Sequence, residues 1–271
     1  MIGAIIGDII GSRFEQPRNN IKTKEFNLFT PTNRFTDDSI LSIAIAKAIL
    51  TAKEDKDQLS QSAIRYLLRY GQHYPHCGFG EGFKKWLWDQ DPQPYGSFGN
   101  GAAMRVGACG LAADSLSEAL ELAEIVTTIT HNHPEGIKGA QATTAAVFLA
   151  NQGSPIEEIE AYIHQHYYPM DFTVDEIRKD YPYDTSCQGT VPYAIKAFLE
   201  SKDFEDAIRN AISIGGDSDT IGAITGSIAE AYYDVPRKIR EKALSYLDLP
   251  LVKTLQDFEA TYPLRKFPDR N

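Results

Sequence analysis

The sequence predicts an all-α protein organised as a single domain over residues 1–271. Apolar residues recur at helical spacing along most of the chain, alternating β-branched runs are short and scarce, and no internal repeat interrupts the pattern. A chain of 271 residues is long for one domain but can still fold around one large core. Composition does not shift at any point that would mark a second domain.

The expected helices begin at the N-terminus. The segment Gly3–Glu15 carries glycines at 3, 7 and 11, which share one helical face and would let another helix approach closely. Ile40–Leu50 is nearly all apolar, so this helix should be buried on most sides. The remaining expected helices are Gln61–Tyr70, Glu81–Trp88, Gly101–Ala112, Ser117–Thr130, Glu135–Ala150, Pro155–His166, Val191–Glu200, Phe204–Ile212, Asp219–Tyr233 and Pro236–Tyr246.

The expected loops hold much of the Pro, Gly and Asn of the chain. They are Gln16–Arg34, Tyr74–Gly80, Asp89–Asn100 and Pro169–Gly189. In an all-helical scaffold, loops of this kind are where a functional site is assembled. Capping residue types at Ser117, Ser154 and Asp203 favour helix starts at these positions.

Charge and cysteine content narrow the class of protein. A formal net charge of −10 argues against broad nonspecific binding to nucleic acid or to an anionic membrane. Three widely spaced cysteines (Cys77, Cys109 and Cys187) predict reduced thiols in a cytosolic setting. Residues 1–11 lack the basic leader of a signal peptide, and no apolar segment reaches the length of about 20 residues that spans a bilayer. We therefore expect a cytoplasmic protein that is a monomer and does not enter a membrane.

Two acidic segments about 180 residues apart are the most informative feature. Thr36-Asp37-Asp38 opens one apolar run, and Asp217-Ser218-Asp219-Thr220 follows Gly215-Gly216 and opens another. Carboxylates beside apolar sequence are costly unless a positive charge neutralises them. Oxygen-only ligands favour Mg²⁺ or Mn²⁺ over zinc. The alternative interpretation is that both segments are ordinary helix N-caps, for which Asp and Thr are favoured.

Two further segments carry weaker signals. The glycine-rich run Gly96-Ser97-Phe98-Gly99-Asn100, followed by Gly101, presents backbone N–H groups that suit a phosphate, and its Phe98 could stack on a base. His131 and His133 form a His-x-His pair, and His73, His76 and Cys77 form a second cluster. Neither cluster has the nearby ligands of a zinc site, so neither is assigned a metal.

Glycines also indicate close packing in the first expected helix and in the helix Asp219–Tyr233. Gly222 and Gly226 resemble a close-packing face in the expected helix Asp219–Tyr233. A nucleotide-binding P-loop is unexpected, because no Gly-Lys-Ser/Thr follows the N-terminal glycines. Glu15 is expected at the end of the first helix, beside a loop and free to act on a ligand.

Taken together, these segments resemble the ADP-ribosylglycohydrolase family. The matches run in the family's order from residue 3 to about residue 230, and the Thr-Asp-Asp and Gly-Gly-Asp-Ser-Asp-Thr segments are the specific ones. The full set of matches is Gly7-Asp8, Gly11-Ser12 and Glu15, Thr36-Asp37-Asp38-Ser39, Gly96-Ser97-Phe98-Gly99-Asn100-Gly101, Met104-Arg105, Thr130-His131 and Gly215-Gly216-Asp217-Ser218-Asp219-Thr220. The resemblance implies a compact orthogonal helical bundle and a centre of two divalent cations, Mg²⁺ or Mn²⁺.

The resemblance also implies roles for individual residues. The metal ligands would be Thr36, Asp37, Asp38, Asp217, Asp219 and Thr220. The substrate-binding residues would be Gly96, Ser97, Phe98, Gly99 and Asn100 around the diphosphate and distal ribose, with His131 on the adenosine side. The candidate catalytic residues are Glu15, Asp37 and Asp38, with Glu15 as the general acid–base.

The implied function is a metal-dependent hydrolase that cleaves the glycosidic bond between ADP-ribose and a serine or arginine side chain of a modified protein. Ser97 stands where relatives that act on arginine often carry an acidic residue, which leans toward O-linked substrates. Residues 180–189 could line the side of the leaving group. The alternatives are a hydrolase of a small conjugate such as O-acetyl-ADP-ribose or a modified nucleic-acid end, and a non-catalytic ADP-ribose-binding or structural protein on the same fold.

Overall fold

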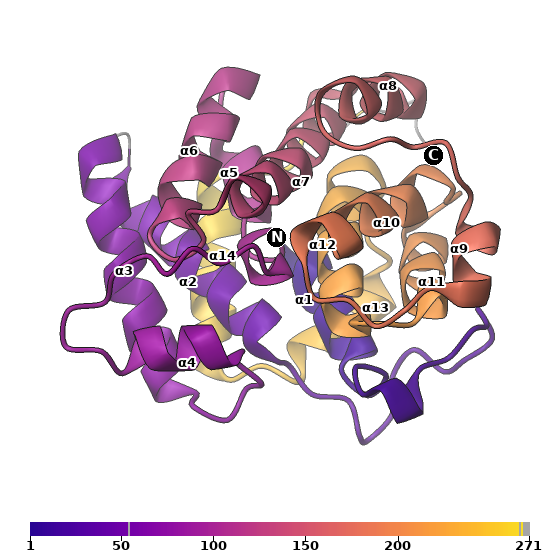
Figure 1. Ribbon diagram of the computed structural model, residues 1–271, viewed down its shortest axis with the longest axis horizontal. Helices are drawn as coiled ribbons and strands as arrows, with labels where there is room; N and C mark the ends of the chain where they lie inside the picture. Colours follow the sequence, from indigo (N-terminus) through magenta and orange to yellow (C-terminus); the bar gives the residue numbers. More distant parts are fainter. Residues whose placement is uncertain (54, 266, 268–271) are drawn as a thin grey trace.

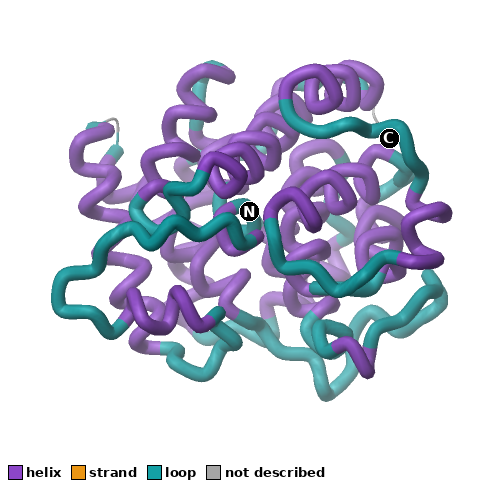
Figure 2. The backbone as a smooth tube through the Cα atoms, in the orientation of Figure 1, coloured by secondary structure: helices purple, strands orange, loops and turns teal. Residues whose placement is uncertain are grey.

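The computed structural model describes residues 1–53, 55–265 and 267, and these are helices joined by loops (Figure 2). The described residues form no strand, although one isolated bridge joins Gly99 to Ser186. The all-α prediction is therefore confirmed. The elements are α1 (Ile2–Gly11), η1 (Pro17–Asn19), α2 (Asp37–Ala52), α3 (Lys56–His73), α4 (Glu81–Leu87), η2 (Asn100–Ala102), α5 (Gly107–Ala112), α6 (Leu116–Thr128), α7 (Pro134–Gln152), α8 (Ile156–His166), α9 (Val174–Asp180), α10 (Cys187–Leu199), α11 (Phe204–Ile214), α12 (Ser218–Tyr232), α13 (Arg237–Leu244) and α14 (Leu249–Thr261).

Helices α1 and α12 lie against each other and are almost completely buried. A Cβ atom added at Gly7 would stand 1.9 Å from the carbonyl oxygen of Gly222, and one added at Gly3 would stand 2.1 Å from that of Gly226. Two backbones can meet at this distance only where neither carries a side chain. The predicted close approach of another helix is confirmed, and it brings the C-terminal half of α1 to the start of α12.

The other helices pack around this pair (Figure 1). Helices α7, α10 and α11 contact α12, whereas α3 and α14 contact α2. Most residues of α2 are buried, as its apolar sequence predicts, but the helix begins at Asp37 and so includes both acidic residues in its first turn. The two acidic segments therefore begin two buried helices.

Two expectations about helix bounds are wrong. The expected helix Gly101–Ala112 is the short turn η2 followed by α5, and the residues between them are buried against neighbouring helices. Helix α1 ends at Gly11, so Glu15 lies four residues beyond the helix and not at its end.

Two helices are missing from the prediction. The expected loop Pro169–Gly189 contains α9, which Thr173 and Glu176 start with a reciprocal capping box, as well as the beginning of α10. Helix α14 lies beyond the last expected helix, and Asp248 caps it. Helix α9 exposes most of its surface, so its apolar periodicity is weak. Helix α14 buries Leu251, Thr254, Leu255 and Phe258 at helical spacing, so its pattern is readable although the prediction lacks it.

The expected capping residues have different outcomes. Asp203 caps α11 by accepting the Asp206 N–H at 2.7 Å, as predicted. Helix α6 is capped by Ser115 and not by Ser117. Ser154 precedes Pro155, which is the N-cap residue of α8 and makes no side-chain capping bond.

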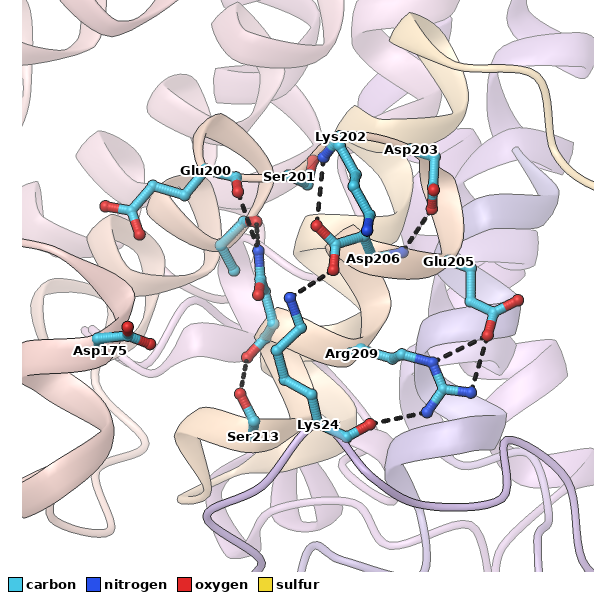
Figure 3. Close-up of polar contacts among 12 residues, drawn as sticks. Lys24, Asp175, Glu200, Ser201, Lys202, Asp203, Glu205, Asp206, Arg209 and Ser213 are labelled. Atoms are coloured by element: carbon cyan, nitrogen blue, oxygen red, sulfur yellow. Dashed lines mark hydrogen bonds and ion pairs between the residues drawn. The ribbon is translucent and has the colours of Figure 1, made fainter.

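The segment between α1 and α2 is fastened to α11 (Figure 3). Lys24 pairs with Asp206, and Arg209 pairs with Glu205 at 2.8 Å. Arg209 Nη1 also donates to the carbonyl oxygens of Lys24 and Phe26 at 2.8 and 2.9 Å. These bonds hold the segment that follows Glu15 against the body of the protein.

The cysteines and the helix lengths bear on the remaining expectations. All three cysteines are free thiols, which confirms that they form no disulfide framework. Among the described helices, none combines the length and apolar character that a membrane span requires.

Candidate metal centre and ligand cavity

The first acidic segment opens α2. Thr36 is the N-cap residue, and its hydroxyl oxygen accepts the Asp38 N–H at 3.4 Å, so the capping interpretation holds for this threonine. Asp37 and Asp38 lie in the first turn, Asp38 buried and Asp37 half-buried. The Asp37 N–H donates to the Cys77 carbonyl oxygen at 2.8 Å, which joins this turn to the loop before α4.

The second acidic segment opens α12 after a left-handed turn. Gly215 and Gly216 adopt φ angles of +76° and +73°, which disfavour residues with a Cβ atom. Asp217 is the N-cap residue of α12 but makes no capping hydrogen bond. Its carboxylate instead accepts from the Asn100 side-chain amide at 2.7 Å. The capping interpretation therefore does not account for Asp217.

Asn20 holds this glycine turn from the side of Glu15. Its Oδ1 accepts the Gly216 N–H at 2.6 Å, and its Nδ2 donates to the Gly216 carbonyl oxygen at 3.0 Å and to the Phe14 carbonyl oxygen. Lys22 Nζ donates to the Ile214 carbonyl oxygen at 2.7 Å. The segment after α1 thus braces the turn that presents Asp217.

Asp8 joins the two acidic segments from the middle of α1. Carboxylate oxygens of Asp8, Asp38 and Asp219 lie within 4.8 Å of one another, and all three residues are buried. The Asp8 carboxylate accepts the backbone N–H groups of Thr36 at 2.9 Å and Ser39 at 3.0 Å, and both side-chain hydroxyls. It therefore anchors the first turn of α2 and faces α12 as well.

Asp8 is absent from the predicted ligand set, although it belongs to the segment that carries the family resemblance. The available signal is a single acidic residue in the otherwise apolar sequence of α1. Such a residue is seldom buried without a compensating partner.

Asp38 has the environment expected of a metal ligand. Its Oδ2 lies 3.2 Å from the Thr36 hydroxyl and 3.3 Å from the Thr220 hydroxyl. Its Oδ1 is buried and has no hydrogen-bond partner within the described part of the chain. A buried carboxylate oxygen without a donor is unstable unless a cation satisfies it.

The cluster carries unfavourable charge. Burial raises the pKa of Asp38 well above its ordinary value, and the nearby carboxylates of Asp8, Asp37 and Asp217 raise it further. Burial followed by the charges of Asp217 and Asp38 does the same to the pKa of Asp219. Burial, then Asp8 and Asp217, raises the pKa of Asp37. A divalent cation would offset both the cost of burying these charges and the repulsion between them.

The donor set fits a hard cation. The one group of candidate metal ligands found among the described residues contains carboxylates alone. Hydroxyl oxygens of Thr36 and Thr220 lie beside them. Mg²⁺ and Mn²⁺ prefer such oxygen ligands.

Glu15 lies close to this cluster. Its side chain is half-buried, and its Oε2 lies 3.6 Å from Nη2 of the exposed Arg34. Burial raises the pKa of Glu15, the negative charge of Asp217 raises it further, and Arg34 opposes the shift. A carboxyl group with a raised pKa is suited to accept and return a proton.

A cavity of about 270 Å³ opens beside the acidic segments. Eight of the predicted site residues line it, and they are Asp37, Asp38, Ser97, Gly99, Asn100, His131, Asp217 and Thr220. Its lining also includes Phe83 and Tyr95, which belong to no motif of the sequence and were not predicted. Arg105, from the matched Met104-Arg105 pair, and Tyr183 and Thr185, from the expected tract 180–189, line it as well. A lining of aromatic rings and carboxylates suits a ligand that carries both a flat ring and hydroxyl groups.

The glycine-rich loop forms one wall of the cavity. The Gly96 N–H donates to Asn132 Oδ1 at 2.7 Å, and the Gly99 N–H donates to Ser97 Oγ at 3.2 Å. The Asn100 N–H donates to the Thr185 carbonyl oxygen at 2.7 Å, which connects this loop to the segment before α10. The loop is thus fixed before any ligand binds.

The other predicted site residues lie outside the cavity lining. These residues are Glu15, Thr36, Gly96, Phe98 and Asp219. The Phe98 ring is exposed and packs against the ring of His133 at a centroid distance of 5.2 Å. The stacking of this exposed ring on a base stays a prediction.

Fold and site together define an all-α enzyme with a carboxylate centre beside a ligand cavity. The chain belongs to the ADP-ribosylglycohydrolase family, whose model matches residues 1–262, and it is a hydrolase of the all-α bundle type found in that family.

Known proteins resemble this chain over most of its length. It is 26% identical to the ADP-ribosylhydrolase ARH3 of Homo sapiens, over 91% of this chain and 88% of that protein. It is 24% identical to the ADP-ribosylarginine hydrolase Tri1 of Pseudomonas putida (strain GB-1), over 87% of this chain and 70% of that protein. A solved structure described as an ADP-ribosylglycohydrolase-related protein complex shares the fold with a TM-score of 0.67 at 23% identity, over 97% of this chain and 95% of that one.

Proposed function

We propose that this chain is a divalent-metal-dependent hydrolase that cleaves the glycosidic bond between ADP-ribose and a serine or arginine side chain of a modified protein, releasing ADP-ribose. The observation that carries the proposal is the buried Oδ1 of Asp38, which has no partner among the described residues and belongs to a cluster of carboxylates at the cavity. A binding or structural protein would have no need to retain so unfavourable a cluster.

The proposed metal ligands are Thr36, Asp37, Asp38, Asp217, Asp219 and Thr220, which would hold two ions of Mg²⁺ or Mn²⁺. When bound, such ions supply Lewis-acid stabilisation and orient the ribose and a water molecule. Asp8 has the supporting role of fixing α2 through its four accepted hydrogen bonds. Asn100 has the corresponding role for Asp217.

Ligand binding is assigned to the cavity. The loop Gly96, Ser97, Phe98, Gly99 and Asn100 would follow the diphosphate and the distal ribose, since its backbone is held in place by Asn132 and Thr185. His131 and the rings of Phe83 and Tyr95 would accept the adenosine side.

Glu15 is the proposed general acid–base. Cleavage at the anomeric carbon passes through an oxocarbenium-like state, so a proton must reach the leaving group or leave the attacking water. The raised pKa of Glu15 favours such an exchange, because the group holds a proton more readily than an ordinary glutamate. Asp37 and Asp38 contribute by fixing the reacting ribose, which can lower the barrier by several kcal/mol.

The proposed leaving group is a serine side chain of the modified protein. Ser97 lines the cavity without a carboxylate of its own, which favours an O-linked serine substrate over arginine. Tyr183 and Thr185, from the tract 180–189, line the cavity and would contact the leaving group. The proposed active form is one domain over residues 1–271, monomeric and cytoplasmic, with ADP-ribosylated protein as its partner.

The decisive experiment measures free ADP-ribose released from a serine-linked peptide, an arginine-linked protein and O-acetyl-ADP-ribose. Each substrate is assayed with Mg²⁺, with Mn²⁺ and with EDTA. We expect release from the serine-linked peptide with either metal and none with EDTA. Absence of release from all three substrates would refute the hydrolase assignment, and release from O-acetyl-ADP-ribose alone would move it to small conjugates.

A Glu15→Gln variant tests the role of the acid–base. We expect kcat to fall about 100-fold while ADP-ribose binding is retained. The matched control is Glu81→Gln, which changes an exposed carboxylate in the first turn of α4. Unchanged turnover in Glu15→Gln would remove Glu15 from the mechanism.

A further inference from the structure

Arg105 is a completely buried guanidinium at the wall of the cavity. Within the described part of the chain it has no carboxylate partner within ion-pairing distance, and its Nε and Nη1 have no hydrogen-bond partner. Its one hydrogen bond runs from Nη2 to the hydroxyl oxygen of Thr130 at 2.6 Å. Burying an arginine without an acidic partner is costly, so this single bond needs an explanation.

The Thr130 hydroxyl accepts one hydrogen bond and donates another, and the chemistry of its neighbours decides which. A guanidinium can only donate, so the Thr130 hydroxyl accepts from Arg105 and keeps its own proton for another partner. Two acceptors are near this proton: His131 Nδ1 at 2.7 Å and the Thr127 carbonyl oxygen at 3.4 Å. The longer distance is outside the normal range for an O–H···O bond.

The Thr127 carbonyl oxygen is also already occupied. It accepts the Thr130 N–H at 3.1 Å and the His131 N–H at 2.8 Å. With both lone pairs engaged, this carbonyl competes poorly for the hydroxyl proton. The Thr130 hydroxyl therefore donates to His131 Nδ1.

The tautomer of His131 follows. If Nδ1 accepts a hydrogen bond, the ring proton of the neutral imidazole must reside on Nε2. A Cβ atom added at Gly101 would stand 3.4 Å from this Nε2 and one at Gly99 would stand 3.7 Å from it, so Nε2 lies along the glycine-rich loop. No hydrogen bond to Nε2 is found among the described residues, and His131 lines the cavity.

The ring is also kept neutral. Burial lowers the pKa of His131 well below its ordinary value, and the positive charge of Arg105 lowers it further. The ring of Tyr95 lies beside it at a centroid distance of 5.6 Å. His131 thus offers the cavity one hydrogen-bond donor and no charge.

We infer that Arg105 and Thr130 are positioning residues that fix His131 as a neutral Nε2–H donor for an oxygen acceptor of the bound ligand. This inference rests on the proposed function for the identity of that ligand, ADP-ribose, whose phosphate and ribose oxygens are acceptors. It makes the site selective for an acceptor at this point of the ligand and against a second donor, such as an amino group.

The direct test is the ring-nitrogen NMR spectrum of ligand-free protein, with His131 assigned by loss of its signals in His131→Ala. We expect the Nε2–H tautomer near pH 7, with Nδ1 as a hydrogen-bond acceptor. In Thr130→Val the Nδ1 resonance should move to that of an unbonded nitrogen, whereas Thr130→Ser should retain the wild-type signals. An Nδ1–H tautomer or a protonated ring in wild type would overturn the inference.

The second test measures ADP-ribose affinity by calorimetry. We expect Thr130→Val to bind about tenfold more weakly, because an unrestrained donor loses most of one hydrogen bond. Thr130→Ser should bind within about twofold of wild type. In a His131→Ala background, Thr130→Val should have almost no further effect, since the threonine acts through the histidine. A full additional loss in that background would show a merely structural role.

Variants of Arg105 test the first member of the relay, by which we mean the hydrogen-bonded chain of Arg105, Thr130 and His131. Arg105→Lys keeps a cation that can only donate and should preserve the tautomer. Arg105→Gln offers Thr130 a competing acceptor and should weaken binding about as much as Thr130→Val. Wild-type affinity in Arg105→Gln would remove Arg105 from the relay. If that variant does not fold, loss of the tautomer in a folded Arg105→Lys would contradict the inference that a donor-only cation fixes the tautomer.

The two proposals fail differently. If wild-type protein does not bind ADP-ribose, the proposed function fails, while the NMR signals of the ligand-free protein still decide the relay. If ADP-ribose binds and the wild-type ring has the Nδ1–H tautomer, the relay alone fails.

Discussion

The side-chain amide of Asn100 donates a hydrogen bond of 2.7 Å to the carboxylate of Asp217. The two residues are 117 positions apart, and each begins a different element of the structure. Asn100 Nδ2 also donates to the Thr190 hydroxyl oxygen at 3.1 Å, so its amide nitrogen makes two hydrogen bonds that fix the side chain. The loop assigned to the ligand is in this way coupled to the carboxylates assigned to the metal.

Substitution of Asn100 by Ala should therefore weaken metal binding. Asp217 would lose its donor and its orientation, and loss of such a supporting contact lowers metal affinity about 10- to 100-fold. Titration with Mn²⁺ measures the effect, and Asn19→Ala, an exposed asparagine in η1, is the control. Unchanged Mn²⁺ affinity in Asn100→Ala would separate the loop from the metal centre.

The glycine contact between α1 and α12 predicts a second effect. In Gly7→Ala the new methyl group would meet the backbone of Gly222, so we expect a loss of about 3 kcal/mol in the free energy of unfolding. Gly80→Ala is the control, since a Cβ atom there has no neighbour within 4 Å. Chemical denaturation measures both variants, and equal stability would show that the helices can separate without cost.

Asp38→Asn should have opposite effects on metal affinity and on stability. The change removes one charge from a buried cluster, so the metal-free protein should gain on the order of 1 kcal/mol in unfolding free energy while it loses metal binding. Asp203→Asn, at a true helix cap, should change neither by much because Asn caps as well as Asp. A destabilised metal-free Asp38→Asn would favour a structural role for this carboxylate.

The raised pKa values predict how stability depends on pH. The pKa values of Asp37, Asp38 and Asp219 are raised in the folded protein above the ordinary value of 3.8, so the folded state binds more protons than the unfolded state above that pH. The metal-free protein should therefore gain stability as the pH falls through these raised pKa values towards 3.8. The destabilisation caused by these three groups disappears below their unfolded pKa.

Saturating Mg²⁺ should reverse this dependence, because the bound carboxylates must be ionised and acid then releases the ion. Thermal unfolding at several pH values, with Mg²⁺ and with EDTA, provides the measurement. Parallel pH profiles under the two conditions would contradict the assignment of the cluster to metal.

Much of the fold was accessible from the sequence because it depends on local pattern. The apolar run of α2 and the glycines of α1 predict burial and close helix packing, and both are confirmed. Helix α9 is missing from the prediction because an exposed helix carries little apolar periodicity, although its cap at Thr173 was readable. Helix α14 is missing although both its cap at Asp248 and the helical spacing of Leu251, Leu255 and Phe258 were readable.

The site was accessible only where a residue belongs to a motif. Asp37, Asp38 and Asp217 stand out by their spacing, whereas the contribution of Asp8 depends on contacts with residues 28 and 31 positions away. The packing of the Phe98 ring against the His133 ring is likewise a contact between distant parts of the sequence. Neighbours that are distant in sequence leave no local signal.

Anomalous scattering from crystals of this protein grown with Mn²⁺ shows whether the two acidic segments form one metal centre. We expect two manganese ions between the first turns of α2 and α12, coordinated by Asp38 and Asp219, and their loss in Asp219→Asn. Ions bound only elsewhere, or none beside these carboxylates in wild-type crystals, would contradict this expectation.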